Sequence, residues 1–150
     1  MLVVEEDLGI RDFVKRGTNS FFAEFDPRKD LYDRVFTYLL VLSLLLRVLW
    51  LANPEGLIFD EKYYVNAVRV ILGLPQNPST YAGATVGIDP NTGHPPLAKG
   101  IMALSILLLG DNTYGFRVPS VIFGTISIVI LYLFSKKLSG NRQWALIASF

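Results

Sequence analysis

The run from Val118 to Phe134, VPSVIFGTISIVILYLF, contains 17 residues and no charged side chain. A helix over this run would rise about 26 Å, close to the roughly 30 Å hydrocarbon core of a bilayer. The composition of the whole chain agrees, because 51% is hydrophobic, the mean hydropathy is +0.40 and only 18% is charged, whereas soluble domains carry about 25% charged residues. The sequence therefore predicts an all-α integral membrane protein.

Other apolar stretches lie on either side of this run. Residues 35–52 are apolar apart from three polar side chains and predict a span that precedes the one at 118–135. Residues 97–116 are short and interrupted for a span, so they either cross the membrane or lie along it. Residues 144–150 begin another apolar stretch, whereas a span needs about 20 residues. We therefore expect the chain to end inside a transmembrane helix.

The charged residues are concentrated at the start of the chain. Residues 1–34 hold 14 of the 27 acidic and basic side chains, so they predict a polar arm, placed in the cytoplasm. If 97–116 crosses the membrane, the cluster of Lys136, Lys137 and Arg142 lies outside, against the positive-inside tendency. If 97–116 lies along the membrane, the same cluster lies inside, so the charge pattern weakens the spanning interpretation.

A proline-rich loop at 53–96 follows the first predicted span and holds six of the eight prolines. Within it, residues 61–72 have helical spacing, with Tyr64, Val68 and Ile71 on one face, and Asp60 is placed as the N-cap. Residues 75–93 have no periodicity and predict irregular loop.

Several functional classes have no support in the sequence. The chain has no cysteine, which excludes disulfides and cysteine-ligated metals. A net charge of +1 gives no reason to expect nucleic-acid binding. Dinucleotide, P-loop, zinc-protease and serine-hydrolase motifs do not occur, and no metal-ligand cluster is visible.

The adjacent carboxylates Asp60 and Glu61 are the first candidates for chemistry. Two carboxylates beside an apolar phase are costly unless something uses or pairs them. Adjacent helical residues diverge by about 100°, so both cannot face one reacting atom. One could act as a general base while the other holds a cation. The structural alternative is that Asp60 caps the helix and Glu61 favours its dipole.

Four cations lie near the predicted membrane surface and are candidates for binding a phosphate: Arg47, His94, Lys99 and Arg117. The prolines after His94 fix an extended backbone and hold the chain's one histidine in place. The alternatives are arginines that anchor helix ends at the interface and a solvated histidine in a helix-entry turn.

Taken in order, these features resemble one family. Arg47 near the end of the first predicted span is followed by FDE at 59–61, HPPLAK at 94–99, and FRVPSVIFG at 116–124. The ordered set resembles the amino-terminal part of protein O-mannosyltransferases, membrane glycosyltransferases of the GT-C type. It covers about residues 45–140. Residue 98 is alanine where the family usually has glycine.

The resemblance implies GT-C transmembrane helices with an extracytoplasmic first loop that bears short surface helices. It implies transfer of a sugar, most simply mannose, from a polyprenyl (dolichyl) phosphate to a protein Ser or Thr hydroxyl with inversion. It places the base at Asp60, with Glu61 in support, and assigns the four cations to the leaving phosphate. The family does not generally need a metal or another cofactor. We expect residues 1–150 alone to be inactive.

Two alternatives are compatible with the same residues. A related GT-C enzyme would use a lipid or glycan acceptor, and a non-catalytic, transporter-like membrane protein would use the carboxylates to bind an ion or proton. The partners implied by the resemblance are membrane lipid, the lipid-linked sugar and an acceptor protein, and no nucleic acid. Members of the family often pair, so a homo- or hetero-dimer is an option. The expected location is the plasma membrane or endoplasmic reticulum, with several spans.

Overall fold

In the computed structural model of the chain, described for residues 25–28, 30–76 and 85–150, all regular structure is helical. The prediction of an all-α protein is confirmed for this part of the chain. Two compact units divide the described residues: Leu44–Gly124 form one, and the residues up to Ser43 with Thr125–Phe150 form the other. The helices are α2 (Leu31–Leu49), α3 (Glu61–Leu72), α4 (Pro96–Leu109), α5 (Thr113–Ser139) and α6 (Arg142–Ser149).

Helix α5 contains the charge-free run and extends beyond it at both ends. Its 27 residues rise about 40 Å, and it is the one helix in the described ranges that is long and apolar enough to cross a membrane. Only 11% of its most apolar window is buried by the protein. The large apolar surface of α5 is therefore left for another apolar phase, as the predicted span at 118–135 requires.

The other predicted spans have different outcomes. Helix α2 covers most of the predicted span at 35–52. Its 19 residues include the charged Asp33, Arg34 and Arg47, and its crossing of a membrane stays a prediction. Residues 97–116 do not form one helix, because α4 ends at Leu109 and Gly110 takes a left-handed φ of 90°. With 14 residues, α4 rises only about 21 Å.

Helix α3 begins and ends where the sequence predicts. Asp60 occupies the N-cap position, and Gly73 takes a left-handed φ of 68° at the C-terminus, where the N–H of Leu74 donates to the carbonyl of Arg69 at 2.8 Å. The predicted apolar face is only partly right. Val68 is fully buried, but Ile71 is 55% exposed, because the buried side is centred on Val65 and Val68.

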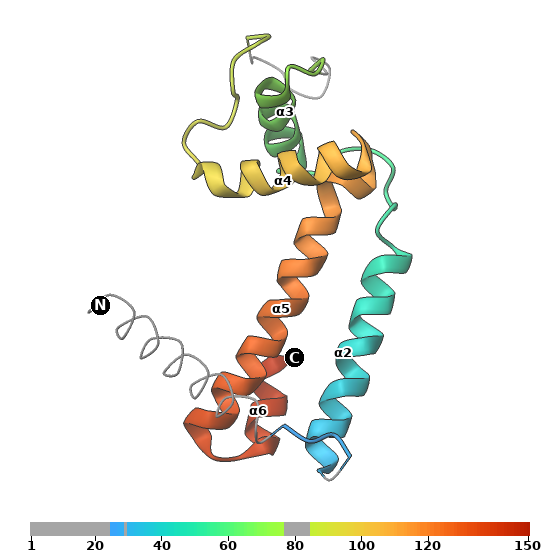
Figure 1. Cartoon of the computed structure of the whole chain (residues 1–150), viewed down its shortest axis with the longest axis vertical. Coiled ribbons are helices and arrows are strands. Elements are labelled where there is room, and N and C mark those ends of the chain that lie inside the picture. Colours follow the sequence, from blue (N-terminus) through green and yellow to red (C-terminus); the bar gives the residue numbers. More distant parts are fainter. Residues whose placement is uncertain (1–24, 29, 77–84) are drawn as a thin grey trace, which may run out of the picture. The chain divides into compact units, whose positions relative to one another are not determined.

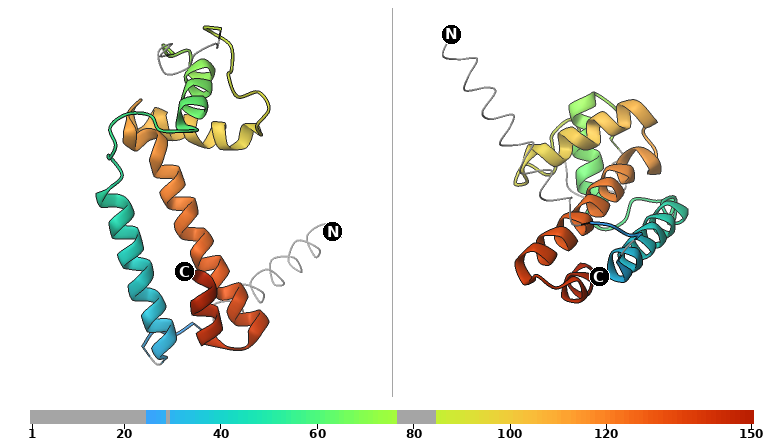
Figure 2. Two further views of the ribbon diagram at one scale, coloured as in Figure 1. Left: turned by 180° about the vertical axis from the view of Figure 1, so that it is seen from behind. Right: turned by 60° about the horizontal axis from the view of Figure 1, so that its bottom comes forward.

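The core of the Leu44–Gly124 unit lies between α3, α4 and the start of α5. Figures 1 and 2 show α3 standing on α4, and α4 running across the start of α5. The buried side chains come from all three helices: Val65, Val68, Ala103, Ile106 and Phe116. This packing fixes the first turn of α3 against the first turns of α5.

The second unit has its own core where α2, α5 and α6 meet. Its buried side chains are Phe36, Tyr132, Leu133 and Ala145, and the rings of Phe36 and Tyr132 stack with centroids 3.9 Å apart. Asp33 is fully buried beside them. Since α2 begins at Leu31, the polar arm predicted over 1–34 is already helical in its last four residues. The rest of that arm up to residue 24 lies outside the described residues.

Candidate active site

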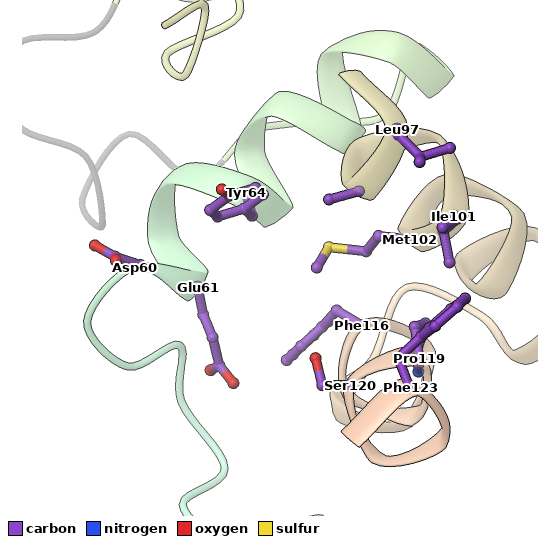
Figure 3. Close-up of a pocket in the computed structure, with 11 residues that line it drawn as sticks. Asp60, Glu61, Tyr64, Leu97, Ile101, Met102, Phe116, Pro119, Ser120 and Phe123 are labelled. Atoms are coloured by element: carbon purple, nitrogen blue, oxygen red, sulfur yellow. The ribbon is translucent and has the colours of Figure 1, made fainter. Parts of the chain in front are cut away.

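The two carboxylates at the start of α3 point in different directions (Figure 3). The Asp60 side chain is exposed, makes no capping hydrogen bond, and has no hydrogen-bond or ion-pair partner in the part of the chain that the structure describes. Phe59 before it takes φ 39°, a left-handed value uncommon for a non-glycine residue, which turns the chain into α3. Asp60 therefore occupies the predicted N-cap position without capping the helix.

Glu61 is instead held by Arg117 in a two-pronged ion pair. Its Oε1 accepts from Arg117 Nε at 2.7 Å and its Oε2 from Nη2 at 2.9 Å, while the backbone N–H of Ile58 donates to Oε2 at 3.1 Å. Partial burial raises the pKa of Glu61, but the hydrogen bonds from Arg117 and Ile58 and the charge of Arg117 outweigh it and hold that pKa below its usual value. The carboxylate of Glu61 is therefore held in its ionised form by Arg117.

Arg117 also ties the loop before α3 to α5. Nη1 donates to the carbonyls of Leu51 and Pro54, both at 2.9 Å, and Nη2 donates to the carbonyl of Gly56 at 3.1 Å. With the two bonds to Glu61, all five guanidinium N–H groups are engaged, and the residue is 9% exposed. A phosphate would have to displace one of these bonds, so the geometry favours a role in holding the loop.

The other predicted cations occupy distinct places. Arg47 is exposed, and its guanidinium lies against Gly124, where an added Cβ would meet Nη1 at 2.6 Å. His94 Nδ1 is 2.9 Å from the hydroxyl of Tyr64. Lys99 is 3% exposed and donates to Asp89 Oδ2 at 2.8 Å. The sequence interpretation did not include Tyr64 as a site residue, although its position one turn after Asp60 placed it on the right part of α3.

Asp60 lies where two hollows of different character meet. The first, which we call the apolar cavity, has a volume of about 540 Å³ and is walled by α4 and α5, with Leu97, Ile101, Met102, Phe116 and Phe123 among its residues (Figure 3). The second, the polar hollow, has a volume of about 450 Å³ and includes Tyr63, Tyr64, Asn91, Thr92 and His94. Asp60 lines both, whereas Lys99 and Arg47 line neither.

The arrangement suits the abstraction of a proton beside an apolar binding surface. An accessible carboxylate without a fixed cation can accept a proton from a hydroxyl placed in the polar hollow. The neighbouring carboxylate is already neutralised by Arg117. Within residues 25–28, 30–76 and 85–150, no group of three or more His, Asp or Glu side chains is placed to hold a metal ion.

Comparison with known proteins gives two matches. The family model described as dolichyl-phosphate-mannose-protein mannosyltransferase matches residues 93–150. A polyprenol-phosphate-mannose–protein mannosyltransferase of Corynebacterium glutamicum is 32% identical over 134 residues, which cover 81% of this chain and 25% of the relative. The chain thus spans a quarter of the length of this curated relative. No solved structure matches. The resemblance to protein O-mannosyltransferases is confirmed by these two matches.

Proposed function

We propose, from this similarity to protein O-mannosyltransferases, that the chain carries the catalytic loop of a multi-pass membrane glycosyltransferase. The reaction is transfer of a mannosyl group from a polyprenyl phosphate to a serine or threonine hydroxyl of a protein. The catalytic loop between α2 and α4 lies on the extracytoplasmic side. Pairing with a second copy or a related chain belongs to the same proposal.

The observation that carries the proposal is the position of Asp60 between the apolar cavity and the polar hollow. A lipid-linked sugar has an apolar tail and a polar head, and a peptide hydroxyl must approach that head from the aqueous side. The apolar cavity fits the first prenyl units, and the polar hollow fits the phosphate-linked sugar and the approaching acceptor. Asp60 is then the accessible carboxylate at their junction.

The reaction assigns one step to Asp60. The acceptor oxygen forms a bond to the anomeric carbon from the face opposite the phosphate, and the hydroxyl proton passes to the Asp60 carboxylate. The bond from the anomeric carbon to the phosphate oxygen breaks, and its electron pair leaves with the polyprenyl phosphate. A single attack from the opposite face inverts the anomeric configuration, through a transition state with oxocarbenium character.

The leaving phosphate needs cationic or N–H donors nearby. Since the donors of Arg117 are all engaged, we assign this role to Arg47 and His94. Arg47 has no hydrogen-bond acceptor among the described residues, and it lies against Gly124, next to the cavity wall residue Phe123. His94 lines the polar hollow, and its Nε2 has no partner in the described part of the chain.

The experiment is transfer of radiolabelled mannose from polyprenyl phosphate to a Ser/Thr peptide by the full-length protein reconstituted in membranes, since residues 1–150 alone are expected to be inactive. Replacing Asp60 by Asn should lower kcat about 10²- to 10⁴-fold, since a general base contributes a factor of this size. Glu55→Gln is the matched control, because Glu55 is an exposed carboxylate of the same loop. Full activity of Asp60→Asn would contradict the assignment of the base.

Two alternatives are outcomes of the same assay. Label that appears in lipid or glycan instead of peptide would identify a related transferase with a different acceptor. No transfer to any acceptor would favour an ion-binding, transporter-like protein. A transporter is expected to place its ionisable groups near the bilayer midplane, whereas Asp60 and Glu61 lie in the loop after α2.

A further inference from the structure

We propose that Lys99 and Asp89 form a clasp that fixes His94 in the polar hollow that Asp60 also lines, so that Lys99 is a positioning residue of the proposed active site. This inference rests on the proposed function for its catalytic meaning. The contacts that define the clasp are independent of any reaction. It differs from the role in phosphate binding that the sequence predicts for Lys99.

The first part of the clasp is the ion pair. Lys99 belongs to the first turn of α4, and its Nζ donates to Asp89 Oδ2 at 2.8 Å and to the carbonyl of Asn91. The other oxygen of Asp89, Oδ1, accepts from the backbone N–H of Asn91 at 2.7 Å. One lysine and one carboxylate therefore fold the loop back onto the helix that follows it.

The second part connects this ion pair to His94. The carbonyl of Asn91 that accepts from Lys99 also accepts from the backbone N–H of His94 at 3.1 Å. Pro95, with φ −56° and ψ 142°, and Pro96 then lead directly into α4. The backbone of His94 is thus held between a carbonyl fixed by Lys99 and a stiff entry into the same helix.

The third part fixes the imidazole ring. Nδ1 lies 2.9 Å from the hydroxyl of Tyr64, and the two rings meet edge to face with centroids 5.5 Å apart. Tyr64 comes from α3, which packs on α4. The ring is therefore held by one helix and its backbone by the other. Because Nδ1 is engaged, Nε2 is the nitrogen available in the polar hollow that Asp60 shares.

The burial of Lys99 argues for the clasp and against direct phosphate binding. Lys99 is 3% exposed, and its Nζ already donates to Asp89 and to the carbonyl of Asn91. Burial raises the pKa of Asp89, but the hydrogen bonds and charge of Lys99 and the Asn91 N–H more than compensate, so that pKa lies below its usual value. A buried lysine without its carboxylate would be costly, so Lys99 and Asp89 act as one unit.

The test follows the ring of His94 by ¹⁵N NMR in the 150-residue chain in detergent micelles, where His94 is the only histidine. Lys99→Met and Asp89→Asn should each shift and broaden the ring signals, and the double variant should do no more than either single one. Asp111→Asn is the matched control, because it removes the ion pair between Arg69 and Asp111 at 2.9 Å in the same unit. It should leave the ring signals unchanged.

Unchanged His94 signals in Asp89→Asn, with helical content retained, would overturn the clasp whether or not the protein is a transferase. Kinetics with the full-length protein in membranes give a second readout. Both variants should lower kcat about 10²-fold with the KM for the lipid donor unchanged, as expected for a misplaced group. A raised donor KM in Lys99→Met but not in Asp89→Asn would instead identify Lys99 as a phosphate ligand. Absence of transfer in the wild type would count against the proposed function, while the NMR result would stand.

Discussion

Arg117 performs a task at this position that a lysine cannot perform. Its planar fork meets both oxygens of Glu61 while three loop carbonyls accept the remaining N–H groups. An ammonium has three donors around one point and cannot reproduce this pattern. Arg117→Lys should therefore lower the free energy of unfolding by about 2 kcal/mol or more. Thermal unfolding in detergent would measure the loss, and an unchanged melting temperature would show that the charge alone suffices.

The ion pair of Glu61 also predicts a pH dependence. Its folded-state pKa lies below the ordinary 4.5, so the unfolded chain takes up the proton first as the pH falls. The stabilisation is complete above the unfolded-state pKa and is lost as the pH drops through the folded-state value. Glu61→Gln should thus be less stable than the wild type at neutral pH, and the difference should shrink below about pH 4.5. A difference that is constant with pH would exclude the ion pair as its source.

At the residue scale, the sequence predicted that Asp60 and Glu61 have separate roles, because helical geometry points adjacent side chains in different directions. The sequence could not show which of the two carboxylates is held in an ion pair, since Arg117 is 56 residues from Glu61. The four cations were equivalent in sequence, as each borders an apolar run. Which cations hold a loop and which stay accessible depends on backbone carbonyls that the fold brings near them, and the sequence does not show these contacts.

At the scale of elements, the joint between α4 and α5 depends on the absence of a side chain at Gly115. A Cβ built there would lie 2.0 Å from the carbonyl oxygen of Gly110, which is backbone and cannot rotate away. Gly115→Ala should therefore destabilise the fold, even though alanine favours helix elsewhere. We expect a loss of about 2 kcal/mol or more, as for other backbone clashes.

Gly100 provides the control for this prediction. It lies inside α4, and a Cβ there would meet no atom within 4 Å. Gly100→Ala should stabilise the protein by about 1 kcal/mol through helix propensity. Unfolding of the two variants in detergent compares them directly. If Gly115→Ala is also stabilising, the tight joint does not exist in solution.

The elements themselves were the most predictable part of the fold. Helix α3 was predicted from its apolar spacing and from Asp60 at its start, which are local signals, and the structure adds Gly73 at its end. The sequence left open whether 97–116 crosses the membrane or lies along it, because apolar residues continue up to Leu109, where α4 ends. The charges in 31–34 predicted a polar arm, whereas α2 already begins at Leu31, where the Asp30 carboxylate accepts from the backbone N–H groups of Tyr32 and Asp33.

At the scale of the whole molecule, residues far apart in sequence make one buried polar cluster. Asp33 accepts from the hydroxyl of Tyr132 and from Lys136 Nζ at 3.1 Å, across 99 and 103 residues. At the edge of this cluster, the partly exposed side chain of Arg142 in α6 lies 3.4 Å from Asp30. Nothing local in the sequence indicates this cluster. From the sequence, the basic residues after α5 were interpreted only through the positive-inside tendency.

Lys136 and Lys137 can distinguish a role in membrane topology from a role in the ion pair with Asp33. Both add the same charge beside the apolar run, so a role in topology alone would make their replacements equivalent. Lys136 is 6% exposed and bound to a fully buried carboxylate, whereas Lys137 is exposed. Lys136→Met should thus leave Asp33 without its cation and cost about 3 kcal/mol of unfolding free energy, while Lys137→Met should cost less than about 0.5 kcal/mol. Equal unfolding free energies for the two variants would show that the lysines act only as topological charges.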